Sequence, residues 1–324
     1  MWEEKMNLIE VVVVRKVMEA EGIVSFELER PDGTRLPAFS PGAHIDVHIP
    51  CGLVRQYSLC NPSRDASRYR IAVLRDRNSR GGSEAMHSSV REGDCIRISE
   101  PRNCFSLKAG VANNILLAGG IGITPMMSMA YQLADEGSSF DLHYCTRTSS
   151  CTAFYDELRR SDFGDNVFLH VDDGTLDQRF DIRSTLMSCS EETHLYVCGP
   201  QGFMHAMLGT AREMGWDESR IHFEFFGATV PSEACDSEFE IQIQSSGKIV
   251  VVSENQTIAS ALAEVGIKVP MSCEQGVCGT CRTRVISGTP DHRDVYLTEV
   301  EREKNDQIIP CCSRSKSSRI VLDL

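Results

Sequence analysis

From residue 8 to about residue 100, hydrophobic residues occur in short runs that polar turn residues separate. The runs are rich in Val, Ile, Leu and Tyr, and Gly, Pro, Asn and Asp lie between them. The six runs are Leu8–Val14, Ile23–Leu28, His44–Ile49, Tyr57–Leu59, Arg70–Leu74 and Cys95–Ile98. Short runs of this composition are typical of β-strands, and little helical periodicity lies between them. The pattern predicts a small antiparallel barrel or sandwich.

The pattern changes near residue 111, where strand-like and helix-like segments begin to alternate. The predicted strands are Asn114–Ala118, Asp141–Cys145, Val167–Val171, Leu195–Cys198 and Ile221–Phe225. The predicted helices are Pro125–Leu133, Ala153–Arg160 and Gly202–Met214. Alternation of this kind predicts a parallel sheet with helices packed against it.

The small and polar residues of Gly227–Ser237 indicate a linker, and a third kind of pattern follows it. A hairpin-like pair, a helix and a closing strand predict a small α+β unit. These elements are Phe239–Gln244, Lys248–Val252, Thr257–Val265 and Ile320–Leu322. We therefore expect three domains, at residues 1–106, 107–228 and 238–324.

Composition and charge limit the function classes. The 324 residues are 41% hydrophobic and 24% charged, as in folded globular proteins. A net charge of −13 argues against nucleic acid as the main partner, because phosphate binding needs clustered Lys and Arg. The longest apolar runs, such as Ile115–Ala118, are far shorter than the ~18 residues of a membrane span. The acidic N-terminus lacks the apolar core of a signal peptide, so we expect a cytoplasmic protein with no membrane partner.

Cysteines near the C-terminus carry the strongest chemical signal. Cys273, Cys278 and Cys281 form a C-x4-C-x2-C run, and Cys311 and Cys312 follow about thirty residues later. This is the plant-type spacing of a [2Fe–2S] cluster held by four thiolates, and the glycines within the run allow backbone amides to approach the sulfides. Zinc sites more usually pair two C-x2-C units, and only one half of this run has that form. The spacing leaves the fourth ligand open between Cys311 and Cys312.

Two segments of the first domain suit a phosphorylated aromatic ligand. Strand alternation places Arg55 and Tyr57 on one face and Gln56 and Ser58 on the other. The later segment Arg80–Ser83 has paired glycines and a serine before a helix-like stretch, which exposes backbone amides to an anion. Taken separately, an exposed Arg beside a half-buried Tyr, and an ordinary turn with a helix cap, explain these segments as well.

A glycine-rich turn, Gly119-Gly-Ile-Gly122-Ile-Thr124-Pro125, follows the first strand of the predicted parallel sheet. The glycines permit a tight turn and the close approach of a pyrophosphate. Thr124 suits the N-cap of the next helix and Pro125 its first position. The turn differs from the G-x-G-x-x-G fingerprint because Pro125 stands at the third glycine position.

Together these motifs resemble the ferredoxin–NADP reductase superfamily. The order of a flavin barrel, a nicotinamide domain and a C-terminal ferredoxin resembles the phthalate dioxygenase reductase family over essentially the whole chain. The resemblance implies a multidomain protein with an antiparallel β-barrel flavin domain, an α/β parallel-sheet nicotinamide domain and an α+β ferredoxin-like (β-grasp) domain. It also implies FMN rather than FAD as the flavin.

The resemblance also implies roles for particular residues. The flavin-binding set is Arg55, Gln56, Tyr57, Ser58, Gly81, Gly82 and Ser83. The nicotinamide set is Gly120, Gly122, Thr124 and Cys198, and Phe226 is the aromatic residue that relatives bring to the flavin. Cys198 and Phe226 act in catalysis together with Ser58. The cluster ligands are Cys273, Cys278, Cys281 and Cys311, since the family has a small residue two positions after its last ligand, as Ser313 is after Cys311. For Cys198 and Phe226 the alternative is an ordinary core residue.

A functional hypothesis follows from the three cofactors. NADH gives electrons in pairs, a [2Fe–2S] cluster accepts them singly, and a flavin can do both. We expect hydride transfer from NADH to FMN and single-electron transfer through the cluster to a terminal Rieske non-haem iron oxygenase, with the reductase a monomer. NADH is expected over NADPH because a basic cluster that could bind the 2′-phosphate of NADPH is missing. Arg147 offers one cation after the second strand, but Asp172 and Asp173 follow the third strand in the same general region. The alternatives are a stand-alone NADH–flavin oxidoreductase that reduces oxygen, ferric ion or quinone, and a redox sensor.

Overall fold

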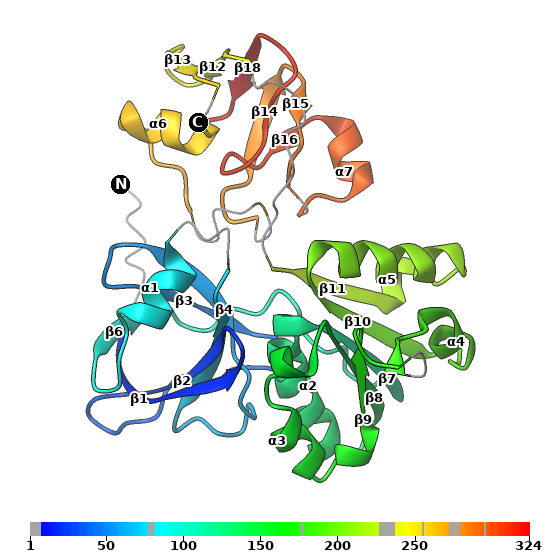
Figure 1. Cartoon of the computed structure of the whole chain (residues 1–324). Helices are drawn as coiled ribbons and strands as arrows, with labels where there is room; N and C mark the ends of the chain where they lie inside the picture. Colours follow the sequence, from blue (N-terminus) through cyan, green and yellow to red (C-terminus); the bar gives the residue numbers. More distant parts are fainter. Residues whose placement is uncertain are drawn as a thin grey trace. The chain divides into compact units, whose positions relative to one another are not determined.

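The computed structural model describes residues 8–76, 81–175, 178–226, 237–254, 256–271, 276, 279–294 and 296–324. The chain divides into two compact units, Met1–Phe226 and Gly227–Leu324. The first unit holds two sheets, and the second unit holds a five-stranded sheet and a two-stranded one (Figure 1). Among the described residues, no helix combines the length and the apolar character needed to cross a membrane.

The first sheet is an antiparallel barrel. Its elements are β1 (Ile9–Ala20), β2 (Ile23–Glu29), β3 (His44–His48), β4 (Val54–Ser58), β5 (Tyr69–Leu74), α1 (Gly82–Ser88) and β6 (Cys95–Ile98). The strand order is β4-β3-β6-β1-β2-β5, and every pairing is antiparallel. An isolated bridge between Leu59 and Ile71 connects the two ends of this order. The barrel predicted from the sequence is therefore confirmed, with a core of aliphatic residues around Phe26 and Tyr69.

The second sheet is parallel. Its strands are β7 (Asn113–Gly119), β8 (Ser139–Thr146), β9 (Val167–Val171), β10 (Thr193–Gly199) and β11 (Ile221–Phe225), in the order β11-β10-β7-β8-β9. Its α-helices are α2 (Ile123–Asp135), α3 (Tyr155–Arg160), α4 (Ile182–Met187) and α5 (Gln201–Glu213). Its 3-10 helices are η1 (Gly120–Gly122), η2 (Ser149–Cys151), η3 (Gly164–Asn166) and η5 (Glu218–Arg220).

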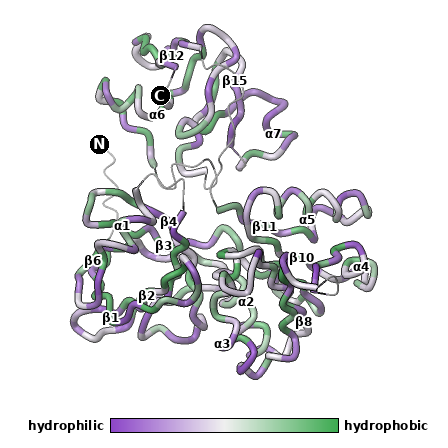
Figure 2. Tube along the Cα trace, in the orientation of Figure 1, coloured by the Kyte–Doolittle hydropathy of each residue, from purple (hydrophilic) through white to green (hydrophobic). Residues whose placement is uncertain are grey.

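The central strand β7 is buried on both faces, which is why it is continuously hydrophobic from Ile115 to Ala118; Figure 2 shows the hydrophobic stretches of this sheet in green. Leu116 and Ala118 of β7 face α2, whereas Ile115 and Leu117 face α4 and α5. Strands β8 and β9 follow on one side of β7, whereas β10 and β11 lie on its other side, so the strand order switches between β7 and β10. Ligands of such folds bind beyond the carboxyl ends of the strands at this switch point. The turn Gly119–Thr124 lies at that position.

Two sequence expectations in this domain were wrong. Thr124 is not the N-cap of α2, because the 3-10 turn η1 runs straight into a helix that begins at Ile123. Thr124 is a buried helical residue, and its hydroxyl donates to the Ile121 carbonyl at 3.1 Å. Helix α4 was not predicted, since only one of its residues, Leu186, is buried and its hydrophobic periodicity is correspondingly weak.

The second unit is the predicted α+β domain. Its elements are β12 (Phe239–Ile243), β13 (Ile249–Val252), α6 (Ile258–Glu264), β14 (Thr283–Ser287), β15 (Pro290–Asp291), α7 (Glu299–Lys304), β16 (Gln307–Ile308), β17 (Arg314–Ser315) and β18 (Arg319–Leu322). The main sheet has the order β13-β12-β18-β14-β16. Helix α6 begins with a capping box between Thr257 and Ser260 and packs Ile258 and Leu262 into the core.

Candidate functional site

The barrel and the α/β domain of the first unit meet at a largely buried carboxyl group, that of Glu224. Ser58, the last residue of β4, donates its hydroxyl to Glu224 on β11 at 3.5 Å. Glu224 is the register partner of Cys198 on the neighbouring strand β10. The structure therefore brings together two of the predicted catalytic residues, Ser58 and Cys198, although they lie on different sheets. Phe226 follows directly after β11 and is 37% exposed.

Glu224 is a functional candidate that the sequence did not reveal. Burial raises the pKa of Glu224 to about 8, and the hydrogen bond from Ser58 offsets only part of this effect. The carboxyl group is therefore largely protonated at neutral pH. His44, on β3, is its nearest basic neighbour, with Nδ1 at 3.9 Å. The sequence signal for Glu224 is that it is the single acid in an otherwise aromatic strand end, Phe223-Glu224-Phe225-Phe226. The sequence motifs point only to Phe226 in this segment.

Cys198 is a neutral thiol. Its side chain is fully buried, and burial, together with the nearby Glu224, raises its pKa well above the usual value. A thiol in such surroundings is neither a nucleophile nor a metal ligand. This leaves two roles for Cys198, packing or a weak hydrogen bond to a ligand at the end of β10.

The glycine turn lies against the same strand end. A Cβ atom on Gly122 would lie 2.2 Å from the carbonyl oxygen of Cys198, so no side chain fits there. Gly120 has φ +51° and open space around it, which leaves its backbone accessible to a ligand. Thr124 supports the turn from within through its bond to the Ile121 carbonyl. Turn η1 and Cys198 therefore line one edge of the site.

We expect Gly122→Ala to abolish NADH binding at this edge while FMN binding is retained. The backbone of Gly122 is right-handed helical, so only the clash with the Cys198 carbonyl opposes the new methyl group. Relief of such a clash costs roughly 1–3 kcal/mol and displaces the turn. Spectroscopic NADH titration and the FMN content of the purified variant measure the two effects.

Gly209→Ala is the matched control, because Gly209 lies in α5 with no heavy atom within 4 Å of the added Cβ. Alanine there is expected to stabilise the helix by up to about 1 kcal/mol and to leave NADH binding unchanged. Equal NADH affinity in the Gly122→Ala variant and the wild type would contradict the assignment of the turn.

The flavin-binding candidates lie on two faces of β4. Gln56 donates to Asp46 at 3.1 Å, on the same face as Ser58. On the other face, the Arg55 side chain passes across Gly82, whose added Cβ would lie 2.6 Å from Arg55 Nε. Arg55 is therefore held beside the start of α1, where Gly81 and Ser83 also lie.

The residues near the start of α1 fit an anionic group. The Ser83 hydroxyl oxygen accepts the Asp76 N–H at 3.1 Å, so its proton can still be donated to a ligand. Gly81, with φ +88°, adopts a left-handed conformation that favours glycine. Tyr57 is partly buried against the barrel core, and burial raises its pKa, so it remains neutral. A guanidinium, a hydroxyl and a glycine-lined gap suit a phosphate.

The second unit holds the described part of the cysteine site. Cys281 and Cys311 are 3% and 5% exposed and belong to one core cluster. Cys312 is less buried, and its thiol lies 3.8 Å from the Ile309 carbonyl. Cys273 and Cys278 lie outside the described residues. Within the described ranges, no three His, Cys, Asp or Glu side chains are grouped to hold a metal ion.

Two glycines of this loop fit the closely wrapped cluster expected from the sequence. Gly276 and Gly279 have φ values of +74° and +69°. An added Cβ on Gly276 would lie 2.4 Å from the Cys312 sulfur, and one on Gly279 would lie within 2.5 Å of the Tyr296 ring. The loop therefore has no space for side chains at these positions. Its donor set of buried thiols suits iron–sulfur chemistry.

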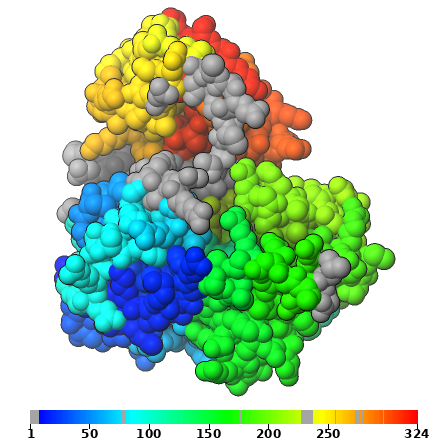
Figure 3. Space-filling model, viewed as in Figure 1, coloured from blue at the N-terminus to red at the C-terminus, as the bar shows by residue number. Residues whose placement is uncertain are grey.

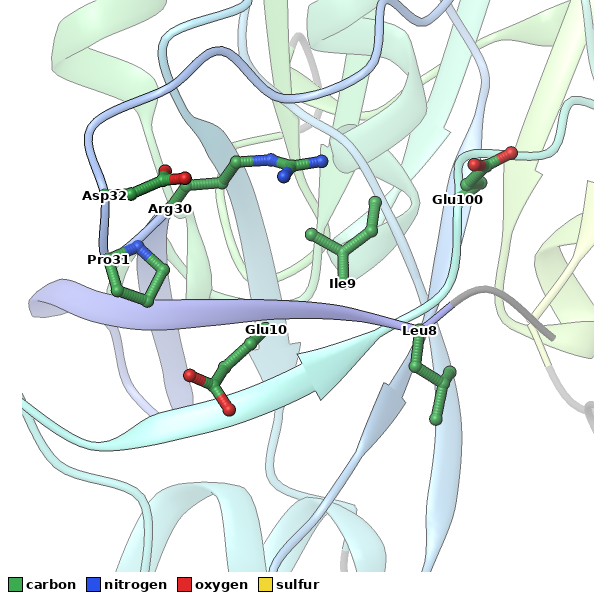
Figure 4. Close-up of a pocket in the computed structure, with 7 residues that line it drawn as sticks. All are labelled: Leu8, Ile9, Glu10, Arg30, Pro31, Asp32 and Glu100. Atoms are coloured by element: carbon green, nitrogen blue, oxygen red, sulfur yellow. The ribbon is translucent and has the colours of Figure 1, made fainter. Parts of the chain in front are cut away.

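A surface pocket elsewhere on the barrel contains none of these residues. It has a volume of about 470 Å³ and is lined by Arg30 and by the carboxylates of Glu10, Asp32 and Glu100 (Figure 4). Three carboxylates against one guanidinium give the pocket a net negative charge, which does not suit the phosphate of a nucleotide. It is separate from the Ser58–Glu224 site in the residues that form it.

Comparison with known proteins supports this division of the chain. A family model for an oxidoreductase NAD-binding domain matches residues 116–208, and one for a 2Fe-2S iron-sulfur cluster binding domain matches residues 241–316. The chain is 50% identical to a vanillate O-demethylase oxidoreductase of Pseudomonas sp. (strain HR199 / DSM 7063), over 98% of this chain and 100% of that protein. It is 38% identical to a tetrachlorobenzoquinone reductase of Sphingobium chlorophenolicum, over 98% of each chain.

A solved structure agrees with the fold as well as the sequence. Phthalate dioxygenase reductase, a modular structure for electron transfer from pyridine nucleotides to [2Fe–2S], matches with a TM-score of 0.80 and 42% identity over 98% of each chain. The chain belongs to the phthalate dioxygenase reductase family. As a member of this family it is an oxidoreductase, and its cofactors are NADH, FMN and a [2Fe–2S] cluster. The resemblance inferred from the sequence motifs is thereby confirmed.

Proposed function

We propose that the chain is the NADH-dependent reductase component of an oxygenase system. It oxidises NADH at the Ser58–Glu224 site and delivers single electrons through its cysteine domain to a terminal Rieske-type oxygenase. The observation that carries this proposal is the meeting of the flavin strand β4, the strand end at Cys198 and the glycine turn η1 around Glu224. The proposed domains are residues 1–106, 107–228 and 238–324.

The flavin is assigned to the barrel. FMN, when bound, supplies the exchange between electron pairs and single electrons. Arg55, Gly81, Gly82 and Ser83 would hold the phosphate. Gln56 and Tyr57 would flank the ring system, and the Ser58 hydroxyl would donate to the edge of the flavin that receives hydride. The Ser58 hydroxyl would exchange its long hydrogen bond to Glu224, at 3.5 Å, for the one to the flavin.

The nicotinamide is assigned to the strand ends of the parallel sheet. Backbone groups of Gly120 and Gly122 would approach the pyrophosphate, and Thr124 would keep the turn in place. The neutral Cys198 thiol would bound the nicotinamide ring, and the Phe226 ring, at the end of β11, would lie against the flavin. This division leaves the reacting groups between the two domains, with binding contacts supplied by both.

The choice of NADH over NADPH rests on charges near the ends of β8 and β9. The Asp172 N–H donates to the Thr146 carbonyl at 3.0 Å, and the Asp173 N–H donates to the Arg147 carbonyl at 3.2 Å. The exposed residues Asp172 and Asp173 are therefore held close to the backbone of Arg147. A 2′-phosphate placed there would meet two negative charges and one positive charge, which favours a free ribose.

The electron acceptor is proposed to be a protein. The vanillate O-demethylase relative is named as the oxidoreductase of such a system, and it is matched over its full length. The tetrachlorobenzoquinone reductase relative favours a second candidate, in which a quinone accepts electrons directly. We further propose a monomer that acts in the cytoplasm. Turnover with a quinone alone, unaffected by added oxygenase, would favour the second candidate.

The first experiment is the absorption spectrum of the purified protein and its anaerobic titration with NADH. We expect a flavin spectrum over broad iron–sulfur bands, with both bleached by NADH and neither bleached at the same concentration of NADPH. Flavin bleaching without any iron–sulfur bands would leave a simple NADH–flavin reductase. Such a result would contradict electron delivery to a Rieske-type partner.

A further inference from the structure

A partly buried ion pair joins the barrel to the α/β domain within the first unit. Arg70, on β5, donates to both carboxylate oxygens of Glu157 on α3, at 2.6 and 2.9 Å. Tyr131, on α2, donates its hydroxyl to the same carboxylate at 2.7 Å. The Arg70 side chain is 14% exposed, and its guanidinium lies 5.1 Å from the centre of the Phe154 ring. Strand β5 of the barrel and helices α2 and α3 of the α/β domain therefore meet at the Glu157 carboxylate.

The arginine of this cluster is less exposed than the arginine of a second ion pair on the same boundary. Burial alone would raise the pKa of Glu157, but Arg70 and the Tyr131 hydroxyl outweigh it and lower that pKa. A bidentate pair of this kind fixes both distance and angle. Arg64 and Asp135 also pair across the boundary. The two acids, Glu157 and Asp135, are equally exposed at 37%, but Arg64 is 65% exposed against 14% for Arg70, so water and salt weaken the Arg64 contact more. Barrel and α/β-domain atoms touch along this boundary (Figure 3).

On the barrel side, contacts lead from Arg70 directly to the flavin strand. The Arg70 carbonyl accepts the Cys60 N–H at 2.8 Å, and the next residue, Ile71, bridges to Leu59. Leu59 and Cys60 follow Ser58, which ends β4. A displacement of Arg70 is therefore transmitted to Ser58 through two backbone contacts and two peptide units.

On the other side, contacts lead from Glu157 to the glycine turn. Tyr131 lies on α2, and that helix begins at Ile123, directly after Gly122 of η1. An α-helix is stiff over the two turns that separate Tyr131 from its start. Strand β5 also contacts η1 directly. The hydrogen-bonded carboxylate therefore connects the strand that would hold the flavin with the turn that would hold the nicotinamide nucleotide.

We propose that Arg70, Glu157 and Tyr131 are positioning residues that set the approach of the nicotinamide to the flavin. The proposal rests on the proposed function, because it assumes a flavin on β4 and a nicotinamide at η1. Hydride transfer depends steeply on the separation of the reacting atoms, and a displacement of about 1 Å can cost about a hundred-fold in rate. The hydrogen bonds of this cluster fix the angle between the barrel and the α/β domain, because they are directional. Apolar packing is non-directional and fixes this angle less well.

The test compares Arg70→Met with Arg64→Met in the full-length, cofactor-loaded protein. Methionine keeps much of the arginine stem and removes the guanidinium. For Arg70→Met we expect anaerobic flavin reduction by NADH to slow by at least about ten-fold, with the dissociation constant for NADH changed by less than about two-fold. For Arg64→Met we expect no change in either quantity, because that ion pair is exposed.

A second readout does not depend on turnover. NAD⁺ added to the chemically reduced protein gives a long-wavelength charge-transfer band when the nicotinamide stacks on the flavin. We expect this band to weaken in Arg70→Met and to keep its intensity in Arg64→Met. Arg70→Lys retains a cation but loses the bidentate geometry, so it should recover part of the rate and part of the band.

The partners of the carboxylate provide milder variants if Arg70→Met does not fold. Tyr131→Phe removes one hydroxyl, and Glu157→Gln removes the charge with little change in shape. Each should reduce the rate and the charge-transfer band, and the combined variant should lose less than the product of the two separate losses, since both act on one cluster. Unchanged rates and bands in both of these variants would overturn the proposal.

The outcomes separate this inference from the proposed function. Wild-type protein whose flavin is not reduced by NADH would contradict the proposed function itself. Normal reduction of the wild type together with an unchanged band and rate in Arg70→Met would overturn the positioning role alone. An equal loss in Arg70→Met and Arg64→Met would also overturn it, because a general weakening of the domain boundary would then explain the effect.

Discussion

Cys311→Ala is expected to remove the iron–sulfur absorption bands and the electron paramagnetic resonance signal of the reduced protein, whereas Cys312→Ala leaves both in place. The two cysteines are adjacent, so the variants are matched in position and chemistry. Cys311 is 5% exposed within the same core cluster as Cys281, as expected for a ligand that closes a buried site. The Cys312 sulfur lies near the Ile309 carbonyl instead.

Loss of the cluster should interrupt electron delivery without affecting the flavin site. Three thiolates hold a [2Fe–2S] centre poorly, so electron transfer to a protein acceptor should fall by at least about a hundred-fold. Anaerobic bleaching of the flavin by NADH should continue at the wild-type rate in Cys311→Ala. Loss of the cluster from Cys312→Ala, with retention in Cys311→Ala, would reassign the fourth ligand.

Glu224→Gln should make the protein more stable above neutral pH. Burial raises the pKa of Glu224 from an ordinary 4.5 to about 8, so the folded protein keeps a proton that the unfolded chain releases. The unfolded state therefore binds fewer protons between these values, and stability falls as the pH rises through this range. The loss is absent below about pH 4.5 and complete above about pH 8, where it amounts to at most about 5 kcal/mol.

The measurement is the midpoint of thermal unfolding of the first unit between about pH 5 and pH 8.5, followed in the cofactor-loaded full-length protein. The wild type should lose stability across this range more steeply than Glu224→Gln. Glu192→Gln is the control, because Glu192 is an exposed carboxyl on the same domain. Parallel pH profiles for the wild type and Glu224→Gln would contradict a protonated carboxyl at this site.

Local patterns were enough to predict the chemistry of each domain. The run from Cys273 to Cys281 spans nine consecutive residues, and its spacing is set by the size of the cluster rather than by the rest of the fold. The turn from Gly119 to Thr124 was predictable for the same reason, although its details were not. Helix α2 begins at Ile123, two residues before the expected start at Pro125, because a 3-10 turn leads into it without a break.

The contacts between distant segments were not predictable in this way. Ser58 and Glu224 are 166 residues apart, and Arg70 and Glu157 are 87 residues apart. The same residue types occur at many exposed positions, where an acid is simply solvated and carries no perturbed pKa. Only the packing of the barrel against the α/β domain brings Glu224 and Glu157 to these partners.

The sequence by itself determined the order of the three domains, the family, the cysteine spacing and the glycine turn, because each depends on residues close together in the chain. The tertiary structure decided which side chains share a site. It placed Ser58 and Cys198 beside Glu224, and it paired Arg70 with Glu157 across a domain boundary. The physical reason is that hydrogen bonding and desolvation depend on distances in space, which long-range packing sets and local sequence does not.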